Sequence, residues 1–232
     1  MELVIEELQK SFHKKEVLKD INYKFEKGKI YGLLGRNGAG KTTLFNCLNE
    51  DIKINGGKFY ISENGKNRKI VGEDIGYVMS TPVVPTFLTG REFLRFFLDI
   101  NKNKLKNPKT EDEYFELIKI EKEDRDKLIK DYSLGMQNKM VMLVNILSNA
   151  KIFLLDEPLT SLDIVAAEEI KNMFKEIKNE HIVILSTHIM ELALEMCDEI
   201  VLLNNGELEK VDRKNLNDAE FKEKIINSLM EK

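Results

Sequence analysis

Apolar runs of strand length recur along this chain, separated by turns or by stretches with helical spacing. The runs are rich in Val, Ile, Leu, Phe and Tyr, a composition typical of buried or half-buried strands. Several of them are followed by glycine or a charged residue, and "GGKFYIS" begins with a Gly-Gly turn. The predicted strands are "LVIEEL", "VLKDINYKF", "KIYGLL", "GGKFYIS", "IGYVMS", "KIFLLD", "HIVILS", "EIVLL" and "ELEKV".

The middle of the chain, residues 86–150, changes to the spacing of amphipathic helices. Thr110 and Glu113 are spaced as a capping box, which predicts a helix start. Strands and helices alternate again after this block, with an Asn-Gly turn before the last predicted strand. This alternation predicts an α/β fold whose mostly parallel sheet is covered on both faces. The later predicted helices are Asp163 to about Asn179, Ile189 to Met196, and a short amphipathic helix within 215–232.

The charge, the apolar runs and the cysteines argue against several classes of function. The net charge is −4, which is too balanced for a typical nucleic-acid binder, so we expect no nucleic-acid partner. No run approaches the roughly 20 apolar residues that span a bilayer, and the first residues lack the apolar core of a signal peptide. We therefore expect the chain to stay inside the cell. If a membrane is involved, we expect another chain to span it. Cys47 and Cys197 lack metal-ligand spacing, which predicts reduced, buried thiols.

The stretch "GRNGAGKTT", residues 35–43, matches G-x-x-x-x-G-K-[ST] and lies between a predicted strand and a predicted helix. Glycines allow consecutive backbone N–H groups to surround a phosphate, and the helix N-terminus points its positive end at the same anion. We expect Lys41 to reach the β- and γ-phosphates, Thr42 to ligate Mg²⁺ and Thr43 to contact the α-phosphate. The other loop residues expected to contact the nucleotide are Gly35, Asn37, Gly38, Ala39 and Gly40.

Two adjacent carboxylates end the predicted strand "KIFLLD". Ligands bind at the carboxyl ends of strands in open α/β sheets, so we expect both carboxylates beside the phosphate loop. Asp156 is predicted to hold Mg²⁺ directly or through water, and Glu157 to act as the general base that orients the attacking water. The simpler alternatives are a Gly-rich turn that only feeds a helix and a pair of solvated charges at a strand end.

Further motifs follow in order, and together they resemble the nucleotide-binding subunit of an ABC transporter over essentially the full chain. "KDYSLGMQNKM" resembles the signature motif of that family, "LTSLD" its D-loop, and "STH" its switch-histidine motif. The resemblance implies a P-loop NTPase (RecA-like) core, an N-terminal antiparallel β-subdomain and an inserted α-helical subdomain. It implies one ABC ATPase domain over 1–232, divided into a core with the β-subdomain (1–85 and 151–214), a helical subdomain (86–150) and a C-terminal helix (215–232).

The resemblance also implies roles for single residues. Ser133 and Gly135 are expected to contact a γ-phosphate held by the other subunit, and Asp163 is the acid of the D-loop. His188 is expected to bond the γ-phosphate, and Phe12 to stack on adenine. The residues alone leave simpler readings open: Ser133 as an N-cap, His188 as a packed or solvated histidine, and Phe12 as a core residue.

Departures from the family pattern fall at a few positions. Ser80 stands where the family usually carries a glutamine or glutamate that touches Mg²⁺, so a metal contact from Ser80 is expected only through water. Met136 stands where many members have glutamine, and Asn138-Lys139 replaces a more usual Gln-Arg pair. We expect hydrolysis to survive, because Lys41 and the other catalytic residues are present. The helix "TGREFLRFFLDI" carries more apolar residues than one stripe requires, which favours core packing or a surface for a membrane partner.

The function expected from the resemblance is an ATPase that binds ATP and Mg²⁺ and forms a nucleotide-sandwich dimer with itself or with a homologous subunit. Such a subunit drives a separate transmembrane permease from the inner face of the cell membrane. The signature variant and the lack of a regulatory domain resemble exporters of drugs or antimicrobial peptides. The alternatives are an ABC protein acting on ribosomes or DNA, and a regulatory module in which hydrolysis is incidental. A GTPase is disfavoured because "NKMV" lacks the aspartate of NKxD.

Overall fold

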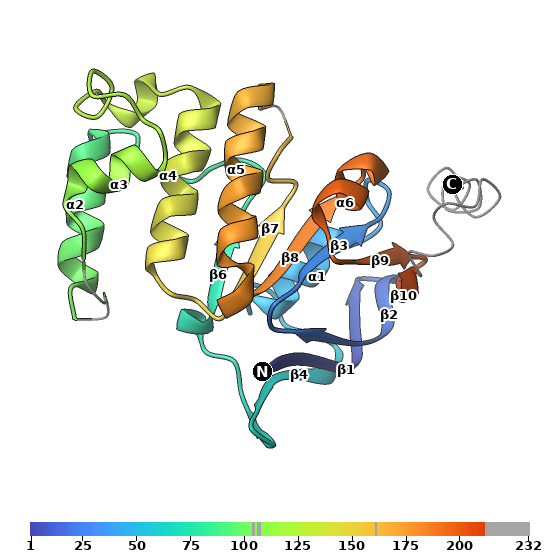
Figure 1. The fold of residues 1–232 in the computed structure, drawn as a ribbon. Coiled ribbons are helices and arrows are strands. Elements are labelled where there is room, and N and C mark those ends of the chain that lie inside the picture. The colour runs from blue at the N-terminus through green and yellow to red at the C-terminus, as the bar shows by residue number, and fades with distance from the viewer. Residues whose placement is uncertain (104, 106–107, 161, 212–232) are drawn as a thin grey trace.

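The computed structural model describes residues 1–103, 105, 108–160 and 162–211, and Figure 1 shows two sheets with helices on both sides of the larger one. The smaller sheet is antiparallel, with the order β2-β1-β4-β5. Short turns join β1 to β2 and β4 to β5, as expected for hairpins. Its strands are β1 (Glu2–Phe12), β2 (Lys15–Glu26), β4 (Gly56–Glu63) and β5 (Lys66–Arg68).

The larger, six-stranded sheet has the order β10-β9-β3-β8-β7-β6 and is parallel except for the edge strand β10. Its central strands β3, β7 and β8 are buried along their whole length, which explains why the sequence shows continuous apolar runs there instead of alternation. The strands are β3 (Ile30–Leu34), β6 (Ile75–Val78), β7 (Ile152–Asp156), β8 (Ile182–Thr187), β9 (Glu199–Asn204) and β10 (Glu207–Val211).

Each face of the larger sheet is covered by a different layer. One face packs against α1 and the antiparallel sheet, in a core that includes Phe25, Tyr31 and Phe45. The opposite face packs against α4, α5 and α6, around Phe153 and Phe174. The helices of these layers are α1 (Lys41–Leu48), α4 (Leu134–Leu147), α5 (Ile164–Ile177) and α6 (Met190–Met196).

A helical part projects from the β6 side of the sheet and is drawn in green in Figure 1. It contains α2 (Gly90–Asn101) and α3 (Glu111–Leu117), and it packs on α4 through a separate apolar cluster that includes Leu94 and Phe115. Both helices begin with complete capping boxes, Thr89 with Glu92 and Thr110 with Glu113. Three short 3₁₀ turns complete the described elements: η1 (Gly72–Asp74), η2 (Ile129–Asp131) and η3 (Lys178–Glu180).

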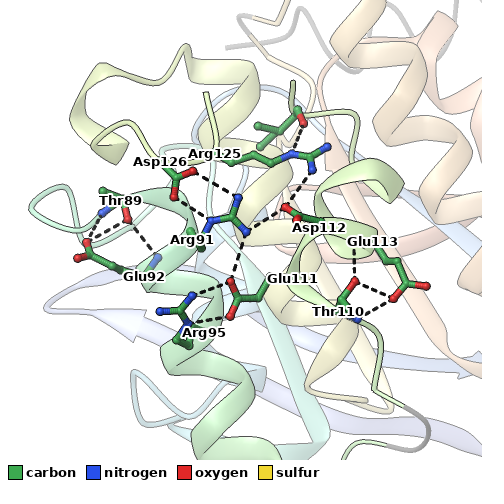
Figure 2. Close-up of polar contacts among 11 residues, drawn as sticks. Thr89, Arg91, Glu92, Arg95, Thr110, Glu111, Asp112, Glu113, Arg125 and Asp126 are labelled. Carbon is green, nitrogen blue, oxygen red and sulfur yellow. Dashed lines mark hydrogen bonds and ion pairs between the residues drawn. The ribbon is translucent and has the colours of Figure 1, made fainter. Parts of the chain in front are cut away.

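Arginine–carboxylate pairs hold this helical part together, as Figure 2 shows. Arg91 on α2 contacts Asp112 (2.9 Å) and Asp126 (2.8 Å). Arg125 is almost fully buried, donates to Asp112 (3.0 Å) and lies over the Phe115 ring. The network therefore ties the start of α2 to α3 and to the segment that follows α3. It joins elements that the apolar pattern alone did not connect.

The structure confirms the predicted α/β class, the mostly parallel sheet covered on both faces, and the capping box at Thr110. The helix predicted to run to about Asn179 ends at Ile177, where a 3₁₀ turn replaces it. Strand β5 was missed, because its three polar residues carry no apolar signal. Cys47 and Cys197 are both buried, as expected. The predicted helix in 215–232 lies outside the described residues, and the predicted division of the domain stays a prediction.

Candidate nucleotide-binding site

The Gly-rich loop joins the end of β3 to the start of α1 at Lys41, as its flanking sequence predicts. Gly38 (φ 81°) and Gly40 (φ 110°) are in the left-handed region, which costs glycine little. A Cβ at Gly40 would also lie 3.0 Å from the Val17 side chain, so this position has no room for one. The loop therefore has the backbone shape that glycine permits, beside the N-terminus of a helix.

The ammonium group of Lys41 is turned back toward this loop and is nearly buried. Its Nζ donates to the carbonyl of Gly35 at 2.6 Å and of Arg36 at 3.3 Å. It also lies 3.3 Å from Glu157 Oε1. A positive charge is thus held at the centre of the loop with a carboxylate opposite it, and a phosphate at this place would meet the ammonium and the helix N-terminus together.

Asp156 ends β7 and is held by two hydroxyl groups from neighbouring elements. Thr42 Oγ1 on α1 donates to Oδ2 at 2.7 Å, and Ser186 Oγ on β8 donates to Oδ1 at 2.6 Å. The parallel register that pairs Asp156 with Ser186 brings the second hydroxyl into reach. Asp156 is 4% exposed, so its oxygens point at the loop and not at bulk water. The carboxylate is oriented before any ligand arrives.

Glu157 has a strained backbone, with φ at 51° for a residue that carries a side chain. Its N–H donates to Ser186 Oγ (3.1 Å) and to the Ser186 carbonyl (3.3 Å), which hold this conformation. Its carboxylate lies 3.0 Å from Nδ1 of His188 and accepts from Thr160 Oγ1 at 3.3 Å. The carboxylate is thus held between a histidine and the Lys41 ammonium, and strain of this kind is typical of functional sites.

These side chains surround one open pocket. Phe12 lies at its rim at the end of β1 and is 44% exposed. The ammonium of Lys10 lies 4.7 Å from the centre of the Phe12 ring, a cation–π contact. The lining residues are Phe12, Lys15, Val17, Asn37, Gly38, Gly40, Lys41, Thr42, Thr43, Asp156 and Glu157. The structure therefore brings together most of the predicted phosphate-loop residues, the acidic pair and the predicted adenine-stacking residue. Gly35, Ala39 and His188 are not among the described residues that line the pocket, and His188 contacts it through Glu157.

Ser133, Gly135 and Asp163 lie away from that lining, at the N-termini of two neighbouring helices. Ser133 caps α4 by accepting from the Met136 N–H (3.2 Å), and Asp163 caps α5 by accepting from the Ala166 N–H (2.9 Å). A Cβ placed on Gly135 would lie 3.8 Å from Ser133 Oγ and 3.9 Å from Asp163 Oδ2. The two caps therefore flank one glycine, as a second group separate from the pocket.

Ser80 follows β6 in an exposed loop and is not among the described residues that line the pocket. The structure thus does not bring it to the acidic pair, and its predicted metal contact stays a prediction. Sequence reasoning gave no site role to Ser186, Thr160, Lys15 or Val17. Ser186 is the first residue of the "STH" motif and Thr160 lies in "LTSLD", but the bond of Ser186 to Asp156 depends on strand register, which the sequence does not reveal.

The donors of this site fit a hard cation bound together with phosphates. The Thr42 hydroxyl and the Asp156 carboxylate are oxygen ligands held 2.7 Å apart. Mg²⁺ prefers oxygen ligands and is commonly bound by one or two protein groups, substrate phosphates and water. Among the described residues, no group of three or more His, Cys, Asp or Glu side chains could hold a metal. A cation at this site would therefore depend on phosphate oxygens.

A sequence model of the family described as "ABC transporter" matches residues 18–160, more than half of the chain. The chain belongs to the ABC transporter family. It is an ABC ATPase and binds adenine nucleotides, as this family does. None of the helices in the described part of this ABC ATPase has the length and apolar character to cross a bilayer.

The sequences of several relatives align with most of this ABC ATPase. It is 34% identical over 204 residues to the uncharacterized ABC transporter ATP-binding protein MJ1023 of Methanocaldococcus jannaschii, covering 87% of this chain and 74% of the relative. It is 30% identical to the bacitracin transport ATP-binding protein BcrA of Enterococcus faecalis (90% and 68% covered). It is 33% identical to the phosphonates import ATP-binding protein PhnC of Fusobacterium nucleatum (90% and 92% covered).

Solved structures show the same fold for this ABC ATPase. An ATP-binding subunit of an ABC transporter superposes with a TM-score of 0.80 at 23% identity, covering 100% of both chains. The ATP-binding cassette MJ0796, solved as a dimer in a post-hydrolysis state with ADP and Pi, gives a TM-score of 0.74 at 21% identity, covering 90% of this chain and 99% of that one. These similarities confirm the predicted fold class.

Proposed function

We propose that this ABC ATPase binds MgATP in the pocket around Lys41, hydrolyses it, and powers a separate transmembrane subunit. The observation that carries the proposal is the arrangement at the ends of β7 and β8, where Asp156 and Glu157 line the pocket with the Gly-rich loop and His188 contacts Glu157. A buried ammonium and two oriented carboxylates around one pocket, with a histidine behind one carboxylate, are groups that suit phosphoryl transfer to water.

Each group has a role that follows from its position. Lys41 and the loop N–H groups bind the β- and γ-phosphates, and Thr43 contacts the α-phosphate. Thr42 and Asp156 hold Mg²⁺, which neutralises charge on the phosphate oxygens when it is bound. The Glu157 carboxylate accepts a proton from the attacking water, so that ADP and phosphate are formed. The Nδ1–H of His188 donates to Glu157, and the other face of the ring is the part of His188 expected to bond the γ-phosphate.

The adenine end of the nucleotide is assigned to the rim of the pocket. Phe12 is exposed there, beside Lys15 and Val17, and an exposed aromatic ring suits stacking on a base. Phe12 is too exposed to be a core residue, which weakens the simpler reading of it. The pocket thus offers an aromatic end and a phosphate end along one line of residues.

We further propose that two such subunits close around two MgATP molecules. Ser133, Gly135 and Asp163 lie outside the lining of the pocket in the same chain, which supports a role on the nucleotide of a partner subunit. A nucleotide that contacts both chains only in the closed dimer favours closure until the γ-phosphate leaves. The partner is a second copy or a homologous ATPase subunit.

The proposed transport role is export of a drug or peptide by a permease on a separate chain, with this subunit at the inner face of the cell membrane. Its similarity to the bacitracin transport protein BcrA supports export. The phosphonates import protein PhnC is similarly related, so an importer is the competing transport role. Co-purification of a membrane subunit from detergent-solubilised membranes, followed by transport assays in both directions, tests this part.

The hydrolysis mechanism is tested by comparing Glu157→Gln with the parent protein. We expect MgATP turnover to fall at least about 100-fold, since a positioned general base contributes about 10²- to 10⁴-fold, while ATP binding is retained. A variant with unchanged turnover would contradict the role of Glu157. Lys171→Met, which removes the α5 ion pair with Glu195, serves as a control with normal turnover.

A further inference from the structure

Helices α4 and α5 run side by side and in the same direction (Figure 1). Two contacts along them establish the direction. Near their N-termini, a Cβ on Gly135 would lie 3.1 Å from Cβ of Ala166. Further along both helices, Lys139 on α4 forms an ion pair with Glu169 on α5. The two helices begin with Ser133 and Asp163, the predicted signature and D-loop residues.

The ion pair is short and largely shielded from water. Lys139 Nζ lies 2.5 Å from Glu169 Oε2, and their side chains are 9% and 17% exposed. Lys139 Nζ also donates to the Lys119 carbonyl at 3.3 Å, and Lys119 Nζ lies 3.4 Å from Glu169 Oε1. The pair therefore connects α4, α5 and the end of α3 at one point.

The Lys139–Glu169 pair also fixes the relative height of α4 and α5, that is, the position of one N-terminus relative to the other along the helix axes. Lys139 follows Ser133 by six residues, and Glu169 follows Asp163 by six residues. At about 1.5 Å per residue, both paired side chains stand about 9 Å from their own helix caps. Joining them at this height places the Ser133 hydroxyl and the Asp163 carboxylate at the same level, on either side of Gly135. A slip of either helix by one residue would separate these groups.

A buried ion pair contributes little net stability, because desolvation offsets much of the attraction, and its best-attested use is to fix register. Apolar packing between α4 and α5 holds the helices together. The charge pair adds to the specification of their relative height, since a slipped helix would separate two poorly solvated charges.

We propose that Lys139 and Glu169 are positioning residues that hold Ser133 and Asp163 level, so that one subunit can receive the γ-phosphate bound by the other. This inference rests on the nucleotide-sandwich dimer proposed above. It assigns a function to Lys139 and Glu169, which touch neither the nucleotide pocket nor the helix caps themselves. It also gives the helical part a rigid connection to α5, and hence to the sheet.

The test uses the Glu157→Gln protein, in which bound ATP persists. Sedimentation velocity gives the monomer–dimer dissociation constant with MgATP, and a fluorescent ATP analogue gives the affinity of the monomer for nucleotide. We expect Lys139→Met to raise the dimer dissociation constant at least tenfold and to change nucleotide affinity less than twofold. Lys139→Arg, which can still reach Glu169, should restore dimerisation to within about threefold of the parent, since it keeps the charge-assisted pair.

A matched control is present on the same helix. Lys171 of α5 pairs with Glu195 at 2.9 Å, and their side chains are 14% and 52% exposed. Lys171→Met therefore removes a similarly shielded lysine and its ion pair from α5, away from α4, and it should change the dimer constant less than twofold. Glu169→Gln is the second variant if Lys139→Met does not fold, with the same expected loss of dimer.

The outcomes separate the two proposals. If the Glu157→Gln parent does not dimerise with MgATP, the sandwich dimer fails and this inference fails with it. If the parent dimerises and Lys139→Met or Glu169→Gln dimerises as tightly as Lys171→Met, the positioning role is overturned while the dimer stands. If the Lys139→Met and Lys171→Met variants weaken the dimer equally, the effect is general destabilisation and the inference is also overturned.

Discussion

The arrangement of single side chains around Asp156 accounts for much of the site. Its two carboxylate oxygens accept from Thr42 and Ser186, and Ser186 also accepts from the Glu157 N–H. Ser186 thus orients both acidic residues without lining the pocket. Loss of a group that holds a metal ligand by a hydrogen bond typically lowers metal affinity or activity by about 10- to 100-fold.

We therefore predict that Ser186→Ala raises the Mg²⁺ concentration that ATP hydrolysis requires. Loss of the 2.6 Å bond frees Asp156 to rotate, and the Mg²⁺ concentration for half-maximal ATP hydrolysis should rise about 10- to 100-fold. Titration of ATPase activity with Mg²⁺ measures this directly. Ser148→Ala, which removes a hydroxyl at the end of α4, is the control. An unchanged Mg²⁺ dependence in Ser186→Ala would show that Asp156 does not need this bond.

His181 gives a residue-level prediction about pH. Its Nδ1 lies 2.6 Å from the Ala150 carbonyl, its ring packs edge-on against Phe153, and burial lowers its pKa below the ordinary value of 6.5. Well above pH 6.5, His181 is neutral in both the folded and the unfolded protein, so it adds little to the pH dependence of the free energy of unfolding. As pH falls below 6.5, the unfolded chain binds a proton that the folded protein resists, so stability falls until the folded pKa is reached.

The free energy of unfolding from urea titrations between pH 7 and 5 measures this effect. The parent should lose up to about 1.4 kcal/mol per pH unit more than His181→Gln, the limit for one proton. Equal slopes in the parent and His181→Gln would contradict the assignment.

The residue-level predictions from sequence succeeded where the motif itself fixes the geometry. A Gly-rich loop between a strand and a helix places Lys41 and Thr42 with little freedom, and a carboxylate after a buried strand must emerge at the same edge of the sheet. Ser186 and Thr160 were missed because their bonds depend on strand register and on a local turn. Ser80 was aligned with a metal contact, yet its loop leaves it exposed and away from the pocket lining.

At the level of helices and strands, the arginine network of Figure 2 differs sharply in burial from one pair to the next. Arg125 is 3% exposed and bonds Asp112 and the Ile120 carbonyl. Arg95 is 57% exposed and pairs with Glu111 at 2.7 Å. Exposed ion pairs contribute between about 0 and 1 kcal/mol, whereas a buried group that loses its partner costs about 1–3 kcal/mol.

We predict that Arg125→Met lowers the free energy of unfolding by about 2 kcal/mol, because the Ile120 carbonyl loses its donor and the Phe115 ring loses its cover. Arg95→Met is the matched change on the same network and should cost less than about 1 kcal/mol. Urea denaturation of both proteins measures the difference. Equal losses would mean that burial does not decide the strength of these pairs.

Element boundaries were predicted well where capping boxes or long apolar runs mark them, as at Thr110 and along β7. They failed where the signal is short or polar, as for β5, whose residues Lys66–Arg68 pair with β4 through backbone groups alone. The packing of α4 against α5 was also beyond sequence reasoning. Gly135 and Lys139 are visible as letters, but their partners on α5 follow from tertiary contacts.

Across the whole molecule, the chain carries two separate groups of residues to which we assign different contacts with a triphosphate. The pocket between the antiparallel sheet and the larger sheet holds a cationic loop opposite an acidic pair. The second group lies at the joined starts of α4 and α5, where the helical part meets the rest of the protein (Figure 1). In the proposed sandwich dimer, the pocket of one subunit and the second group of the other subunit contact the same nucleotide. A monomer cannot bring these two groups to one nucleotide.

The most direct test is a crystal structure of Glu157→Gln grown with ATP and Mn²⁺, which replaces Mg²⁺ and is located by its anomalous scattering. The account predicts a Mn²⁺ peak bound by Thr42 Oγ1, with Asp156 contacting it directly or through one water, and the phosphates enclosed by the loop from Gly35 to Lys41. A nucleotide bound elsewhere, or a Mn²⁺ peak remote from both Thr42 and Asp156, would contradict it.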